Sequence, residues 1–171
     1  QLNAFYRIFA RTMRDLGTPA FPKRLFAEIL TRFEGDAELV QAEFEGQIIA
    51  SAMLIHHQRT TEVPSAACLR QFNHTNANMV MYWALLERAI ERGATSFEFG
   101  RATEGSGPHR FKKQWKAQPS PMGWQRIGLG VRDAGPIVRE DDKFSLAVRM
   151  WQRLPVFVTR GVGPMIARAI P

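Results

Sequence analysis

Cysteine is almost missing from this chain. Its 171 residues contain one cysteine, Cys68, so no internal disulfide can form. No CxxC pair and no Cys/His pair at ligand spacing occurs, and this argues against a zinc site; we expect no metal. A lone thiol favours a reducing compartment, so we expect a cytoplasmic protein in which Cys68 is a small core residue.

Long apolar runs are also missing. No stretch approaches the roughly 18 residues that a membrane span needs, and no leader-like sequence is present. With 45% hydrophobic and 23% charged residues, the composition is that of a folded domain. The first residue is Gln1, and a helical pattern begins almost at once. We therefore expect a fragment of a longer protein that lacks its N-terminal half.

Acidic residues are missing from the last part of the chain. After Asp142 come five basic residues, Lys143, Arg149, Arg153, Arg160 and Arg168, which carry most of the net charge of +7. A solvated tail is one interpretation. The alternatives are a tail that rests on an acidic lipid surface, which would make the protein peripheral on the inner membrane, or one that binds RNA.

Hydrophobic periodicity predicts the order ααβββαβαβ followed by a helical extension. Helices are expected over 3–17, 21–35, 76–92, 109–115 and 143–154, and strands over 38–44, 48–57, 60–72, 95–100 and 121–129. This order predicts an α+β (mixed α/β) domain with a central, mostly antiparallel sheet over 1–130, and a basic helical extension over 131–171.

Three local details accompany this prediction. The first two strands should form a hairpin that turns near Glu45 and Gly46. Pro64 cannot donate to a ladder, so the third strand should be broken, bulged or at an edge there. In the helix over 76–92, Asn76 or Asn78 is the expected cap. The expected core face is an apolar stripe of Val80, Trp83, Ala84, Leu86 or Leu85, and Ile90.

The densest cluster of unusual residues is FEFGRATEGSGPHRFKKQW, residues 97–115. Glycines and a helix start allow main-chain N–H groups to approach an anion, and cationic side chains add donors. The expected binding residues are Arg101, Gly105, Ser106, Gly107, Arg110 and Lys113, with Lys112 beside them. The spacing matches neither a P-loop nor a GxGxxG fingerprint, so a surface turn before a basic helix is the alternative.

This stretch, with YWALLERAIERGA before it and WQRLPVFVTRGVGPMIAR after it, resembles the FemAB-related proteins associated with exosortase/PEP-CTERM systems. The pattern of that group runs approximately FDFGRS, a glycine-rich spacer and YRFKKQWG. This chain departs from it at Glu98, Ala102, His109 and Lys116. The resemblance covers nearly the whole chain.

The resemblance implies a GNAT-like, N-acyltransferase fold, of which this chain would be the C-terminal of two units. It implies transfer of an acyl or aminoacyl group, the latter delivered on tRNA, to an amine or hydroxyl of an envelope or exopolysaccharide precursor. Lys112 inherits the role of stabilising the oxyanion. No permanently bound cofactor is implied; aminoacyl-tRNA or acyl-CoA would be a co-substrate.

The entry to the helix over 76–92 bears on the choice of donor. GNAT enzymes that use acyl-CoA generally hold its pyrophosphate with a QxxGxG-type loop, whereas this chain has QFNHTNAN without a glycine. That favours a donor other than CoA, although Asn76 remains a candidate ligand-binding residue. An acyl-CoA-dependent N-acetyltransferase stays open as an alternative, as does a non-catalytic module that binds polysaccharide or membrane.

Four further residues need an interpretation. His56 and His57 are adjacent in a strand and must point to opposite faces, so they cannot share a metal. His109 is expected to pack or to form hydrogen bonds rather than relay protons. Glu98 is expected to pair with Arg101 or Arg110, the alternative being a general base toward an acceptor amine.

Overall fold

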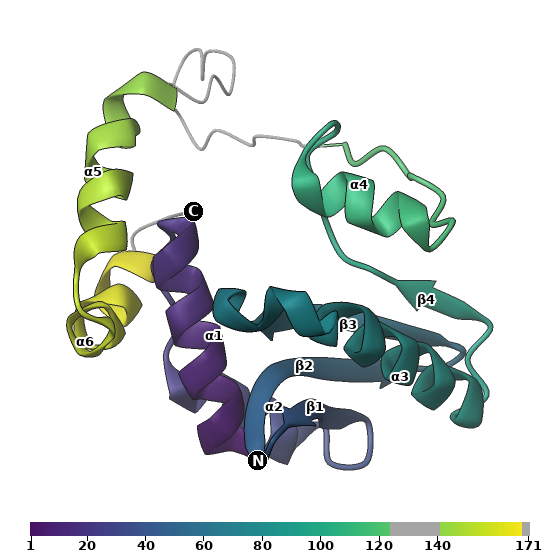
Figure 1. The fold of residues 1–171 in the computed structure, drawn as a ribbon. Coiled ribbons are helices and arrows are strands. Elements are labelled where there is room, and N and C mark those ends of the chain that lie inside the picture. Colours follow the sequence, from purple (N-terminus) through teal and green to yellow (C-terminus); the bar gives the residue numbers. More distant parts are fainter. Residues whose placement is uncertain (124–140, 169–171) are drawn as a thin grey trace, which may run out of the picture. The chain divides into compact units, whose positions relative to one another are not determined.

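The computed structural model describes residues 1–123 and 141–168. The elements along the chain (Figure 1) are α1 (Leu2–Leu16), α2 (Lys23–Arg32), β1 (Ala37–Phe44), β2 (Gln47–His57), β3 (Thr60–Cys68), the 3₁₀ helix η1 (Arg70–Thr75), α3 (Ala77–Glu91), β4 (Ser96–Glu98), α4 (Gly107–Gln114), α5 (Asp141–Arg153) and α6 (Val156–Ala167). This order confirms the predicted α+β class and the helical extension.

The chain divides into two compact units. One comprises Gln1–Gly100 with Ala147–Pro171, and the other is Arg101–Leu146. The predicted boundary at residue 130 and most of the strand predicted over 121–129 lie outside the described residues, so both stay predictions.

One four-stranded sheet, in the order β1-β2-β3-β4, organises the larger unit. The first three strands are antiparallel, whereas β4 runs parallel to β3 after the α3 crossover. Glu45 and Gly46 connect β1 and β2, with φ values of 49° and 76°. Two successive positive φ values match the twist of a two-residue hairpin, so the predicted turn is confirmed.

Strand β3 contains a bulge at Pro64. Met53 pairs with Ser65 and Ile55 with Glu62, so Val63 and Pro64 together face a single residue of β2, Leu54. An extra residue at this point accommodates a proline that has no N–H to donate. The predicted irregularity is therefore confirmed as a bulge.

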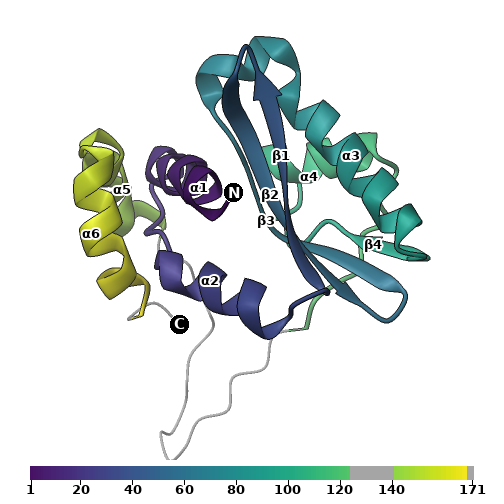
Figure 2. The same cartoon turned by 90° about the horizontal axis from the view of Figure 1, so that it is seen from below.

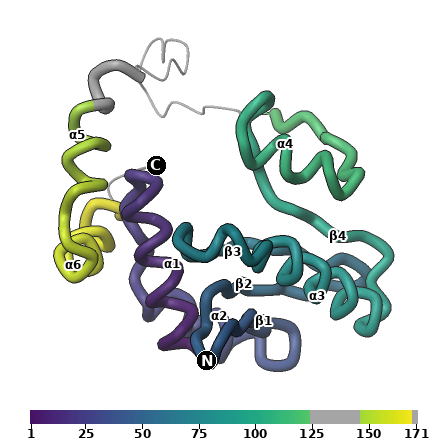
Figure 3. The backbone as a smooth tube through the Cα atoms, in the orientation of Figure 1, coloured from purple at the N-terminus to yellow at the C-terminus, as the bar shows by residue number. Residues whose placement is uncertain are grey.

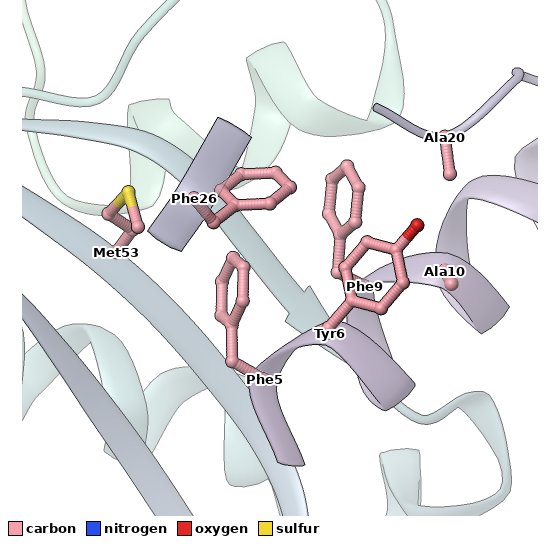
Figure 4. Packing of buried hydrophobic residues seen from close by; sticks show 7 residues of the cluster. All are labelled: Phe5, Tyr6, Phe9, Ala10, Ala20, Phe26 and Met53. Carbon is pink, nitrogen blue, oxygen red and sulfur yellow. The ribbon is translucent and has the colours of Figure 1, made fainter. Parts of the chain in front are cut away.

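The two faces of the sheet carry different helices: α1 and α2 cover one face and α3 covers the other (Figure 2). On the α1 side the core is aromatic. Phe26 lies edge-on to Phe5 and Phe9, with ring centroids 4.9 and 4.8 Å apart, and Met53 of β2 packs beneath them (Figure 4). Cys68, at the end of β3, is only partly buried rather than a full core residue.

Two predictions about helix faces and starts are wrong. Val80, Trp83 and Ile90 of α3 are 61%, 59% and 72% exposed. Of the predicted stripe Leu85 is buried, and it shares the core side of the helix with Ala77, Met81, Tyr82 and Ala89. Both series are apolar and have helical spacing, so periodicity alone cannot choose between them. Likewise, Asn76, an expected cap of α3, directly precedes this helix but its side chain makes no capping hydrogen bond.

Helices α5 and α6 lie on the flank of α1 that faces away from the sheet (Figures 1 and 3). Arg14 of α1 donates to the carbonyl oxygens of Gln152 and Leu154, at 3.4 and 3.2 Å. Gly163 of α6 is buried, and a Cβ there would lie 3.0 Å from the main-chain nitrogen of Ala20. This close approach requires the absence of a side chain.

We expect Gly163→Ala to destabilise the protein relative to Gly161→Ala. Both changes raise helix propensity by about 1 kcal/mol, but only the methyl group at 163 meets backbone, whereas nothing lies within 4 Å of a Cβ at 161. Overpacking typically costs about 1–3 kcal/mol. Urea unfolding of both variants checks this; equal stability would contradict the docking of α6.

Candidate functional site

The N-terminus of α3 is the first place where an anion can bind. Strand β3 leads through η1 to Asn76, which has a left-handed φ of 56°, and the 15-residue helix α3 begins directly after it. No acidic residue lies in its first turn, and the sequence has none between Glu62 and Glu87. A helix start with this composition attracts negative charge.

The hydrogen bonds at this start differ from the predicted cap. The side chain of Asn76 makes no capping bond; instead the hydroxyl of Thr75 accepts from the Ala77 N–H at 3.3 Å and donates to the Phe72 carbonyl at 2.7 Å. The N–H of Asn78 has no hydrogen-bond partner among the described residues. The side chains of Asn73, His74 and Asn76 are exposed around this N–H.

The ladder between β3 and β4 is the second feature. It contains only three pairs, Thr60–Ser96, Thr61–Phe97 and Glu62–Glu98, although β3 continues to Cys68. The last pair places the carboxylates of Glu62 and Glu98 on the same face of the sheet, and both residues are exposed. Glu62 was missed by sequence analysis because nothing in a single strand reveals its register with another.

The segment after β4 contains seven of the eight predicted site residues. Arg101, Gly105, Ser106, Gly107, Arg110, Lys112 and Lys113 lie in one compact unit, whereas Asn76 belongs to the other. Gly105 has a φ of 75°, and Ser106 caps α4 by accepting from the His109 N–H at 3.3 Å. The predicted turn and short helix are confirmed.

The main-chain donors of this loop are largely used within it. The Gly105 N–H donates to Nδ1 of His109 at 3.1 Å, and the Ser106 N–H donates to the Thr103 carbonyl at 3.1 Å. Pro108 has no N–H to offer. The hydrogen-bonding role expected of His109 is confirmed. Because its own side chains and carbonyls occupy these amides, the loop offers an anion mainly side-chain charge.

Lys112 folds back onto the start of its own segment. Its Nζ donates to the Arg101 carbonyl oxygen at 2.8 Å, and burial lowers the pKa of the ammonium. Arg101, Arg110 and Lys113 are exposed. Lys112 is thus a partly buried, oriented donor, and among its exposed cationic neighbours Arg110 donates to the Gly105 carbonyl oxygen at 3.4 Å.

His56 belongs to a buried network on the α3 face. Its Nδ1 lies 2.9 Å from the Thr61 hydroxyl and its Nε2 2.8 Å from the carboxylate of Glu38, which also accepts from Nε of Arg88 at 2.8 Å. Burial raises the pKa of Glu38, but hydrogen bonds from Arg88 and His56 outweigh it and hold the pKa below its usual value. The network ties β1, β2 and β3 to α3 and is structural.

Two features are absent from residues 1–123 and 141–168. No group of three or more His, Cys, Asp or Glu side chains there is arranged to hold a metal ion. None of the helices described there has the length and apolar character to cross a bilayer.

Comparison with known proteins identifies the family to which this fold is related. Residues 1–116 match the family model described as "Acetyltransferase (GNAT) domain". No curated protein matches the chain.

Solved structures share the fold at low identity. A ribosomal-protein-alanine N-acetyltransferase from Brucella melitensis biovar Abortus 2308 has a TM-score of 0.57 at 15% identity, over 74% of this chain and 92% of its own. A glucosamine-6-phosphate N-acetyltransferase from Arabidopsis thaliana has a TM-score of 0.52 at 12% identity, over 74% and 93%. The sheet and helices described above are therefore the GNAT fold, as the resemblance implied.

We expect Glu38→Gln to lower the free energy of unfolding at pH 7 by about 1–3 kcal/mol, because it removes a charged acceptor from two partly buried donors. A depressed pKa contributes stability above the usual carboxyl value and loses it as pH falls. The difference from the unmodified chain should therefore shrink towards pH 3.

The matched control is Glu91→Gln. Glu91 also accepts from Arg88, at 3.0 Å, but its side chain is exposed, so its loss should cost less than about 1 kcal/mol. Denaturant unfolding across this pH range measures both variants. A pH-independent difference for Glu38→Gln would exclude the charged network.

Proposed function

Because the chain belongs to the acetyltransferase (GNAT) domain family, we propose that it transfers an acyl group from acyl-CoA to an amine. The observation that carries this proposal is the start of α3, where a long helix begins without acidic residues and with an unused Asn78 N–H. A pyrophosphate is the group that such a start suits. Polar side chains around Asn76 take the place of the missing glycines.

The short β3–β4 ladder supports the same proposal. Beyond Glu62 the edge of β3 has no β4 pairing, and the amides of an extended acyl carrier resemble a peptide strand that can add to such an edge. The acyl end of a carrier anchored at α3 would then lie along β3.

The reaction requires a base and an oxyanion donor. The amine nitrogen attacks the thioester carbonyl, the carbonyl oxygen becomes negative, and the thiolate of CoA leaves when the tetrahedral intermediate collapses. Lys112 is the proposed donor to the oxygen, supported by its partly buried ammonium and by the resemblance of its segment. Glu62 and Glu98 are the candidate bases for the amine proton.

A second candidate is aminoacyl transfer from tRNA to an amine or hydroxyl of an envelope or exopolysaccharide precursor. The specific observation in its favour is the sequence of residues 97–115, together with the glycine-free entry to α3. In that case an N-terminal half would complete the site. Parallel assays with acetyl-CoA and with aminoacyl-tRNA distinguish the two donors. The second candidate requires turnover with aminoacyl-tRNA and none with acetyl-CoA.

We expect Asn78→Asp to weaken the binding of acetyl-CoA about tenfold while leaving the fold at least as stable. A carboxylate in the first turn improves the helix electrostatically but repels a pyrophosphate. Isothermal titration calorimetry measures the affinity, and thermal unfolding measures the stability.

The matched control is Asn3→Asp, which makes the same change in the first turn of α1. It should leave the affinity for acetyl-CoA unaltered. Unchanged affinity in Asn78→Asp, or an equal loss in both variants, would contradict a donor site at α3.

We expect Lys112→Ala to lower turnover of acetyl-CoA with an amine acceptor by about 10²–10³, the usual cost of one oxyanion donor. Lys116→Ala, at an exposed lysine outside the predicted site, should change it little. In the unmodified chain activity should fall as alkaline pH removes the proton of Lys112, whose pKa burial lowers.

In Lys112→Arg that alkaline loss should vanish, because a guanidinium stays charged throughout the accessible range. Steady-state rates between pH 7 and 10.5 provide the measurement. Full turnover in Lys112→Ala would remove Lys112 from the mechanism.

A further inference from the structure

The outward sides of α5 and α6 carry exposed apolar side chains. Phe157 and Met165 of α6 are 75% and 72% exposed, and Met150 of α5 is 62% exposed. Val162 lies between the two α6 residues and is also exposed. Exposed aliphatic and aromatic groups at this density are unusual for a surface in water and mark an interaction site.

The opposite side of α6 is fixed to the protein. Thr159 and Gly163 are buried, with Gly163 against the main chain of Ala20. Both helices lie on the flank of α1 away from the sheet (Figures 1 and 2), so the outward sides are turned away from the core. The apolar residues are therefore not an internal surface of the described fold.

From Lys143 onward the charged residues in the sequence are all basic. Arg149 and Arg153 of α5, Arg160 of α6 and Arg168 directly after α6 are exposed, and no acidic residue follows Asp142 in the sequence. Arg160 also lies over the ring of Tyr6, 5.4 Å from its centroid. The acidic side chain beside the docked helices, Asp15, is paired with Arg14 at 2.7 Å.

We propose that the outward sides of α5 and α6 dock on the surface of an anionic lipid bilayer. Apolar side chains enter the region between headgroups and acyl chains, and the arginines bind lipid phosphates around them. Aliphatic groups such as Met165 and Val162 would contribute nothing to RNA, which is recognised through phosphates and stacked bases. The proposal is independent of the acyl donor.

The test is co-sedimentation of the full chain with vesicles of phosphatidylcholine alone or of equimolar phosphatidylcholine and phosphatidylglycerol. We expect binding to the anionic vesicles, weakened by salt, and at least about tenfold weaker binding to neutral ones, because each basic residue near such a surface strengthens binding about fivefold. Inorganic phosphate should not displace the protein from the vesicles, which distinguishes a bilayer from a site for a free phosphate.

Two variants separate the contributions. Phe157→Gln with Met165→Gln should lower the partition coefficient about tenfold or more, since two large apolar groups no longer enter the bilayer. The matched control is Val80→Gln with Ile90→Gln, which removes equally exposed apolar groups from α3 and should leave vesicle binding unchanged. Circular dichroism establishes that all variants fold.

Two double variants measure the electrostatic contribution to vesicle binding. Arg149→Gln with Arg153→Gln should weaken binding at least about tenfold, and Arg24→Gln with Arg59→Gln, with the same change in net charge elsewhere, should weaken it much less. If both double variants lost the same vesicle affinity, the net charge of the protein would explain the binding, and a specific role of α5 would be excluded. Equal binding to neutral and anionic vesicles, tighter binding to RNA, or self-association through these residues instead of sedimentation would overturn the proposal.

Discussion

The arrangement of the candidate site depends on where the ladder between β3 and β4 ends. Pro64 cannot donate a hydrogen bond and sits in a bulge of β3, two residues after Glu62 of the last pair, Glu62–Glu98. Two consequences follow from this one constraint. The pair of carboxylates lies at the end of the ladder, and the rest of β3 continues without β4 to the start of α3.

The chain uses two helix starts in different ways. At α4 the main-chain donors are bonded within the loop by Thr103 and His109, which makes the loop a rigid support for Lys112 rather than a cradle for phosphate. At α3 the Asn78 N–H is unused and no carboxylate competes for it. The two starts therefore offer an anion different groups: α3 offers a main-chain N–H, and the segment around α4 offers cationic side chains.

Local sequence patterns predicted much of this fold. What they could not predict depends on how segments that are distant in the sequence pair and pack. The hairpin at Glu45 and the bulge at Pro64 follow from the backbone preferences of a few residues. The core face of α3 did not, because the exposed Val80 and the buried Met81 both belong to apolar series with helical spacing. The bonding of His56 to Glu38 and Arg88 and the pairing of Glu62 with Glu98 arise only when distant segments meet. Structural neighbours at this low identity establish the fold and leave the substrate to experiment.

The most direct test of the account is amide chemical-shift mapping during titration of the isotopically labelled chain with CoA. The account predicts saturable shifts concentrated at the N–H groups of Ala77, Asn78 and Met79, with smaller changes along the free edge of β3. Shifts confined to the segment from Gly105 to His109 would contradict it, because the anion would then bind at α4. An absence of saturable shifts anywhere would exclude CoA as the donor.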